Sequence, residues 1–72
     1  MGKGATVDFR AHRLNCGLPI RAMAAEAGVA PHVWRYMENG GIPQPASRKA
    51  VADYFGLKVT DIWPLDDDER AA

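Results

Sequence analysis

The sequence of 72 residues lacks the features that mark several specialised classes of protein. Its single cysteine, Cys16, cannot form an internal disulfide, so we expect a reducing, cytoplasmic setting. No apolar stretch approaches the roughly 20 residues that a membrane span needs, and the N-terminus carries no hydrophobic segment of a signal peptide. These absences favour one small cytoplasmic domain that has no membrane partner.

The sequence also lacks a set of residues that favours catalysis. It has no Ser/His/Asp set, no paired carboxylates in a cleft and no glycine-rich phosphate loop. His12 and Cys16 have the i, i+4 spacing of two metal ligands, but no other cysteine or nearby carboxylate completes a site. A small buried hydrophobic residue is the simpler interpretation of Cys16. We therefore expect no enzyme activity, no metal, no cofactor and no small-molecule substrate.

The chain has no net charge, but its charged residues are unevenly distributed. The acidic run 66–69 lies near the C-terminus and is typical of a solvated tail. Up to Pro64, eight basic residues stand against five acidic ones, so this part of the chain carries a charge of +3. We divide the chain into a flexible N-terminus (1–5), one domain (6–65) and an acidic tail (66–72).

Glycine and proline residues divide the domain into short helical segments, and no strand-like alternation appears. A hydrophobic residue follows glycine at 17–18, 28–29, 41–42 and 56–57, a pairing typical of helix C-terminal caps. We expect a compact all-α fold of four to five helices. The apolar spacing predicts these core residues: Val7, Ala11, Leu14, Cys16, Ile20, Met23, Ala24, Ala27, Trp34, Met37, Val51, Ala52, Phe55, Val59 and Ile62.

The first of these helices can be capped by Thr6 or Asp8, since both side chains accept a hydrogen bond from a free N–H group. The second covers about 19–27 and the third about 31–39, where Pro31 suits the first helical position. Only residues 28–30 separate these two helices, so they must cross at a large angle, as in a helix-turn-helix.

The third helix has two different sides. Trp34 and Met37 lie three residues apart on the side expected to face the core. The second side is polar, aromatic and basic, which suits hydrogen bonding to base edges. On periodicity alone, an ordinary amphipathic surface helix is the simpler interpretation. The second side comprises His32, Arg35, Tyr36 and Asn39.

The motifs 17–24, 28–30, 37–40, 51–56 and 59–63 resemble the Cro/phage-repressor (Xre-like) helix-turn-helix family. The resemblance covers about residues 9–64. It implies a lambda-repressor-like domain that binds double-stranded DNA as a homodimer and regulates transcription. The implied location is the nucleoid of a bacterial or phage-infected cell.

The same resemblance implies roles for individual residues. The recognition helix would cover about 31–39, and Arg13 and Glu38 match a buried ion pair between the first and third helices. The chain departs from the family at Pro19, Ile20 and Pro31, so no target sequence follows. The DNA-binding residues that the resemblance implies are His32, Val33, Arg35, Tyr36 and Asn39. With the third helix in the major groove, we expect supporting phosphate contacts from Arg21, Arg48 and Lys49.

Two other functions stay open. An accessory DNA-binding protein of a phage or mobile element, acting in recombination or DNA architecture, needs the same motif. A protein-interaction module would use the exposed-looking segment Trp63-Pro64-Leu65 together with the acidic tail. A homodimer contact through Trp63 and Leu65 is the simpler interpretation of that segment, because a small chain gains stability by burying such groups.

Overall fold

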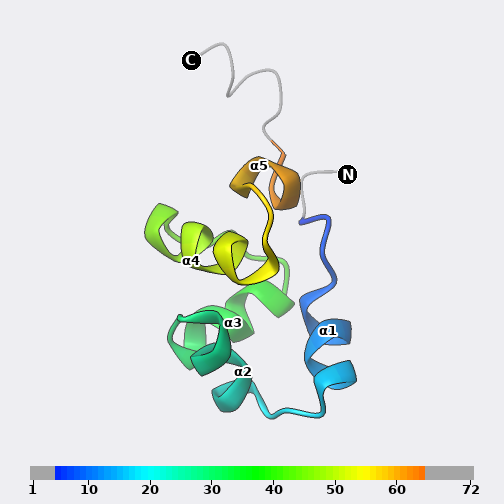
Figure 1. The fold of residues 1–72 in the computed structure, drawn as a ribbon. Coiled ribbons are helices and arrows are strands. Elements are labelled where there is room, and N and C mark those ends of the chain that lie inside the picture. The colour runs from blue at the N-terminus through cyan, green and yellow to red at the C-terminus, as the bar shows by residue number, and fades with distance from the viewer. Residues whose placement is uncertain (1–4, 65–72) are drawn as a thin grey trace.

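The computed structural model describes residues 5–64, and this range contains five α-helices and no strand. The all-α class expected from the sequence is confirmed. Figure 1 shows α2 and α3 packed together, α1 and α4 on different sides of α3, and α5 at the end opposite to α2. No helix in the described range is long and apolar enough to cross a membrane. The helices are α1 (Phe9–Cys16), α2 (Ile20–Ala27), α3 (Pro31–Glu38), α4 (Pro45–Phe55) and α5 (Val59–Ile62).

The helix ends follow the glycine pattern with one exception. Gly17, Gly28 and Gly56 end α1, α2 and α4 in the left-handed conformation, as predicted. At the end of α3 the left-handed residue is Gly40, with φ 94°, as expected for the glycine that closes this helix, and it lies one residue before the Gly41-Ile42 pair. Gly41 instead donates its N–H to a carbonyl in the last turn of α3. Two consecutive glycines made the pattern ambiguous by one residue.

The α1 helix presents to the core a different side from the one expected. Asp8 caps the helix, and Phe9 at its first position is only 3% exposed. Leu14 is 60% exposed, and Ala11 and Cys16 are also exposed, so their predicted burial is wrong. The inward side holds half-buried polar residues after Phe9, and apolar spacing alone cannot detect such a side.

One core joins all five helices. The predicted core positions on α2, α3 and α4 are buried except Ile20 and Phe55, which are partly buried against the core. Phe9 connects two aromatic residues of the core, because its ring meets Trp34 edge-on at 5.4 Å and stacks on Trp63 at 5.8 Å. The core thus fixes α3 against both α1 and the end of the described chain.

Trp63 belongs to this core and not to the surface. Its exposure is 4%, so the expectation that Trp63 is exposed is wrong. Two hydrogen bonds from Thr6 to carbonyl groups of α5, at 2.8 and 2.7 Å, hold the segment before α1 against α5. That segment brings Phe9 over the indole, a long-range contact that the sequence pattern does not reveal. Leu65 and the acidic tail (66–72) lie outside the described residues.

Candidate functional site

The buried side of α3 fixes the helix to the core. Trp34 is fully buried and Met37 is 3% exposed, as their spacing predicts. The α2 helix packs along α3 more extensively than any other pair of helices in the described range. The connection between these two helices consists of residues 28–30 alone, which leaves α3 little freedom to tilt.

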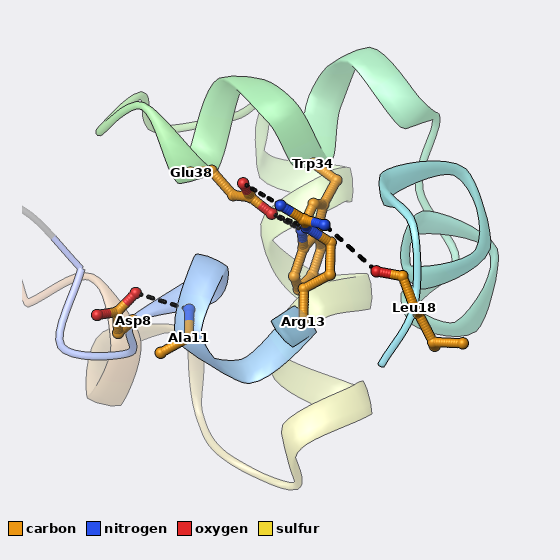
Figure 2. Close-up of polar contacts among 6 residues, drawn as sticks. All are labelled: Asp8, Ala11, Arg13, Leu18, Trp34 and Glu38. Carbon is orange, nitrogen blue, oxygen red and sulfur yellow. Dashed lines mark hydrogen bonds and ion pairs between the residues drawn. The ribbon is translucent and has the colours of Figure 1, made fainter. Parts of the chain in front are cut away.

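A group of polar side chains fixes the C-terminal end of α3 to α1 (Figure 2). Arg13 donates from Nε to Glu38 Oε2 at 2.5 Å and from Nη2 to Glu38 Oε1 at 3.2 Å. The indole N–H of Trp34 donates to Glu38 Oε2 at 2.7 Å. The guanidinium also donates to the Leu18 carbonyl at 3.3 Å, so it links α1, α3 and the connection before α2. The structure thus brings Arg13 and Glu38 together.

These contacts favour the charged forms of both partners. The hydrogen bond from Arg13 lowers the pKa of Glu38 below its usual value, although burial acts in the opposite direction. The same hydrogen bond raises the pKa of Arg13. Glu38 is therefore an ionised carboxylate at neutral pH, and its charge is offset inside the fold.

The opposite side of α3 is exposed to solvent. His32, Arg35, Tyr36 and Asn39 are all exposed, and the exposed fraction of Tyr36 is 54%. None of these four side chains takes part in the side-chain hydrogen bonds or ion pairs found between described residues. No described side chain therefore occupies their donors and acceptors.

The chain segment that includes this exposed side carries a positive charge. Between residues 28 and 50 the only acidic residue is Glu38, and Arg13 offsets its charge. Arg35 lies on α3 itself and is exposed. An anionic partner that approaches α3 consequently meets no uncompensated carboxylate from this part of the chain.

The remaining predicted phosphate-binding residues have different environments. Arg21 on α2 is exposed. Lys49 Nζ lies 3.6 Å from the Asp53 carboxylate in a pair whose side chains are largely exposed, so solvent screens the interaction. Arg48 is half-buried, and its Nε has no hydrogen-bond partner among residues 5–64. Arg21 and Lys49 are thus more exposed to solvent than Arg48.

A groove lies between the exposed side of α3 and the start of α4. Its volume is about 410 Å³. The sequence predicts a binding role only for the α3 members of the groove, His32, Val33 and Tyr36. The signal that could have indicated the groove is the apolar pair Ile42-Pro43 between two helices. The residues that line the groove are His32, Val33, Tyr36, Ile42, Pro43, Gln44 and Ser47.

One wall of the groove depends on a glycine. The ring of Tyr36 lies against Gly41, where a β-carbon on residue 41 would overlap three ring atoms. The Gly41 N–H also donates to the Tyr36 carbonyl at 2.8 Å. The absence of a side chain at position 41 therefore allows the Tyr36 ring to fold back over the connection.

His12 and Cys16 lie close together on α1, where the His12 ring contacts Tyr54 and Phe55 of α4. Cys16 Sγ is 3.6 Å from His12 Nε2, and the same nitrogen is 2.8 Å from the Tyr54 hydroxyl. Burial is the main cause that raises the pKa of Tyr54. Within the described range, no group of three or more His, Cys, Asp or Glu residues is placed to hold a metal ion.

The chain matches no protein-family model, no curated protein and no solved structure. The helix-turn-helix resemblance therefore consists of the sequence motifs alone, and the function is argued from the geometry of α3 and its surroundings.

Proposed function

We propose that the protein binds duplex DNA sequence-specifically, with the exposed side of α3 in the major groove, and acts as a transcriptional regulator. One observation carries the proposal. The α3 helix is fixed to the core along one side, and it presents four polar or aromatic side chains without polar partners in the described structure along the other.

The chemistry of the exposed side suits base edges. Arginine donates to the guanine acceptors, asparagine pairs with both polar atoms of the adenine edge, and histidine and tyrosine hydroxyl groups donate or accept. An α-helix with its side chains is about 10–12 Å in diameter, which matches the width of about 12 Å of the major groove, and the eight residues of α3 give it a length of about 12 Å. The exposed side of α3 therefore fits a segment of a few base pairs.

The fixed position of α3 supports specific rather than general binding. Side chains read bases only when the helix that carries them has a defined position on the duplex. The core contacts of Trp34 and the Arg13–Glu38 pair define that position before DNA binds. Less of the binding free energy is then spent on ordering the recognition surface.

The electrostatics support a phosphate-bearing partner. Arg35 is exposed in the segment 28–50, whose single carboxylate, Glu38, is already paired, and Lys49 forms only an exposed, solvent-screened pair with Asp53. Arg21 on the adjoining helix is a third exposed cation. Such side chains position a protein on the phosphate backbone of DNA and make its affinity for DNA depend on the salt concentration.

Selection from a pool of random duplexes tests the proposal. We expect one family of related sequences to be enriched, and we expect the affinity for the recovered duplex to fall steeply as salt rises. Arg35→Ala should lower the affinity by about tenfold or more, as loss of a base or phosphate contact does. Lys58→Ala, which removes an exposed cation at the start of α5, is the matched control and should change the affinity little.

Two results would contradict the proposal. One is the recovery of no enriched sequence, and the other is equal losses of affinity for Arg35→Ala and Lys58→Ala.

A further inference from the structure

The groove between α3 and α4 has an apolar interior and a polar edge. Val33, Ile42 and Pro43 supply aliphatic surface, and the Tyr36 ring supplies aromatic surface. The polar members are His32, Gln44 and Ser47. The groove contains no acidic residue, and it shares two residues, at positions 32 and 36, with the exposed side of α3. A ligand that contacts this side of α3 therefore reaches the groove as well.

The groove is largely formed before any ligand binds. Pro43 is buried, and Val33 is half-buried. The Tyr36 ring is held over Gly41. Ile42 is 45% exposed, so part of its apolar surface faces water until a partner covers it. Covering this surface adds affinity without a large rearrangement.

The chemistry of base edges selects one occupant for such a groove. In the major groove, guanine, cytosine and adenine present hydrogen-bond donors and acceptors, whereas thymine also presents a 5-methyl group. The methyl group is the apolar feature that an aliphatic groove beside a recognition helix can cover. Gln44 precedes α4 without capping it, so its amide is free for the two polar atoms of an adenine edge.

We infer that the groove receives the 5-methyl group of a thymine, and that Val33 and Ile42 make the protein discriminate thymine from uracil at that base pair. This inference rests on the proposed DNA binding. It adds a specificity determinant outside α3, because Ile42 belongs to the connection between α3 and α4.

The test uses the duplex recovered by selection, with each thymine replaced in turn by deoxyuridine, which lacks only the 5-methyl group. Fluorescence anisotropy gives the affinity of the whole chain for each duplex. We expect a loss of about fourfold at a thymine that faces the groove, which corresponds to the burial of one methyl group. At the other thymines the affinity should stay unchanged.

Two variants assign the methyl contact to the groove. The uracil effect is the loss of affinity when the thymine is replaced by deoxyuridine. In Ile42→Ala this loss should nearly disappear, because the groove no longer covers the methyl group. Leu57→Ala is the control, since Leu57 is similarly exposed at 42% but lies outside the groove, and it should retain the fourfold effect. Circular dichroism verifies that both variants are folded.

The outcomes separate this inference from the proposed function. A duplex that binds equally well with uracil at every position would overturn the inference and leave DNA binding intact. A uracil effect of the same size in Ile42→Ala and Leu57→Ala would place the methyl contact elsewhere and also overturn the inference. If selection recovers no duplex, the proposed function and the inference both fail.

Discussion

The two sides of α3 differ in whether their side chains have partners within the described structure. On the buried side, Trp34 packs against Phe9, and the Glu38 carboxylate accepts hydrogen bonds from both Arg13 and Trp34. On the exposed side, Arg35 and its neighbours have no polar partner within the described structure. One helix of eight residues thus separates the residues that stabilise the fold from those that are free to bind. Substitutions on the two sides should affect different measurements.

Removing the Trp34 side chain should have the largest effect on stability. Trp34→Ala leaves a cavity in the core and removes the indole donor to Glu38, and we expect a loss of about 3–5 kcal/mol in the free energy of unfolding. A small domain has little more stability than this, so much of the variant should be unfolded at room temperature. Urea denaturation followed by far-UV circular dichroism measures the loss. A loss below about 1 kcal/mol would show that the buried side of α3 is not what holds the helix.

Breaking the Arg13–Glu38 pair should have a smaller effect. Glu38→Gln keeps the shape of the side chain but removes its charge, and we expect a loss of about 2 kcal/mol at pH 7, since hydrogen bonds to a charged group are lost. Asp53→Asn is the matched control. It breaks an exposed pair with Lys49 and should change stability by less than about 0.5 kcal/mol. Equal effects of the two substitutions would mean that the buried pair behaves as a surface pair.

The effect of Glu38→Gln should also depend on pH. The pKa of Glu38 is lower in the folded state than in the unfolded chain, so its carboxylate stabilises the fold above the unfolded value of about 4.3. This stabilisation is lost as the pH falls through the folded pKa. Urea titrations at several pH values should therefore show a constant difference between wild type and Glu38→Gln near neutral pH, and a smaller one below about pH 4. A difference that does not change with pH would contradict the assignment.

Substitutions at two adjacent glycines at the end of α3 should separate an effect on stability from an effect on DNA binding. Gly40→Ala places a side chain at φ 94° and should destabilise the fold by about 1 kcal/mol. Gly41→Ala meets only the far end of the Tyr36 side chain, which can turn away, so stability should change by less than about 0.5 kcal/mol. Because the displaced ring is a wall of the groove, Gly41→Ala should nevertheless weaken DNA binding more than Gly40→Ala. Thermal melts and anisotropy titrations of both variants measure this, and the reverse order of affinities would contradict the role of Tyr36.

Substitutions on the exposed side should have the smallest effects on stability. His32→Ala and Arg35→Ala remove side chains that contact solvent, and each should change the free energy of unfolding by less than about 0.5 kcal/mol. The same variants should lose affinity for the selected duplex. A variant that loses stability and affinity in proportion would show that the two sides of α3 are not independent.

The parts of the fold that could be predicted from the sequence have local causes. Glycine and proline residues set the limits of α2, α3 and α4, and apolar spacing identified Met23, Trp34 and Val51 as core residues. The failures all involve contacts between distant segments. Trp63 is buried because Phe9 is brought over it, and the inward side of α1 includes polar residues whose partners lie on other helices.

The candidate site could be predicted only in part for the same reason. The exposed side of α3 follows from helical periodicity, since His32 and Tyr36 lie opposite Trp34. The groove requires Ile42 and Gln44 to return towards α3, and this depends on the path of the connection. No periodic pattern describes that path.

The most direct test of the central claim is a map of the surface that contacts DNA. In a nuclear magnetic resonance titration of the isotope-labelled protein with the selected duplex, we expect the largest shift changes in three places. These are the exposed side of α3, residues 40–44 and the first turn of α4. Changes centred on α1 or α5, with α3 unaffected, would contradict the proposal that α3 is the recognition helix.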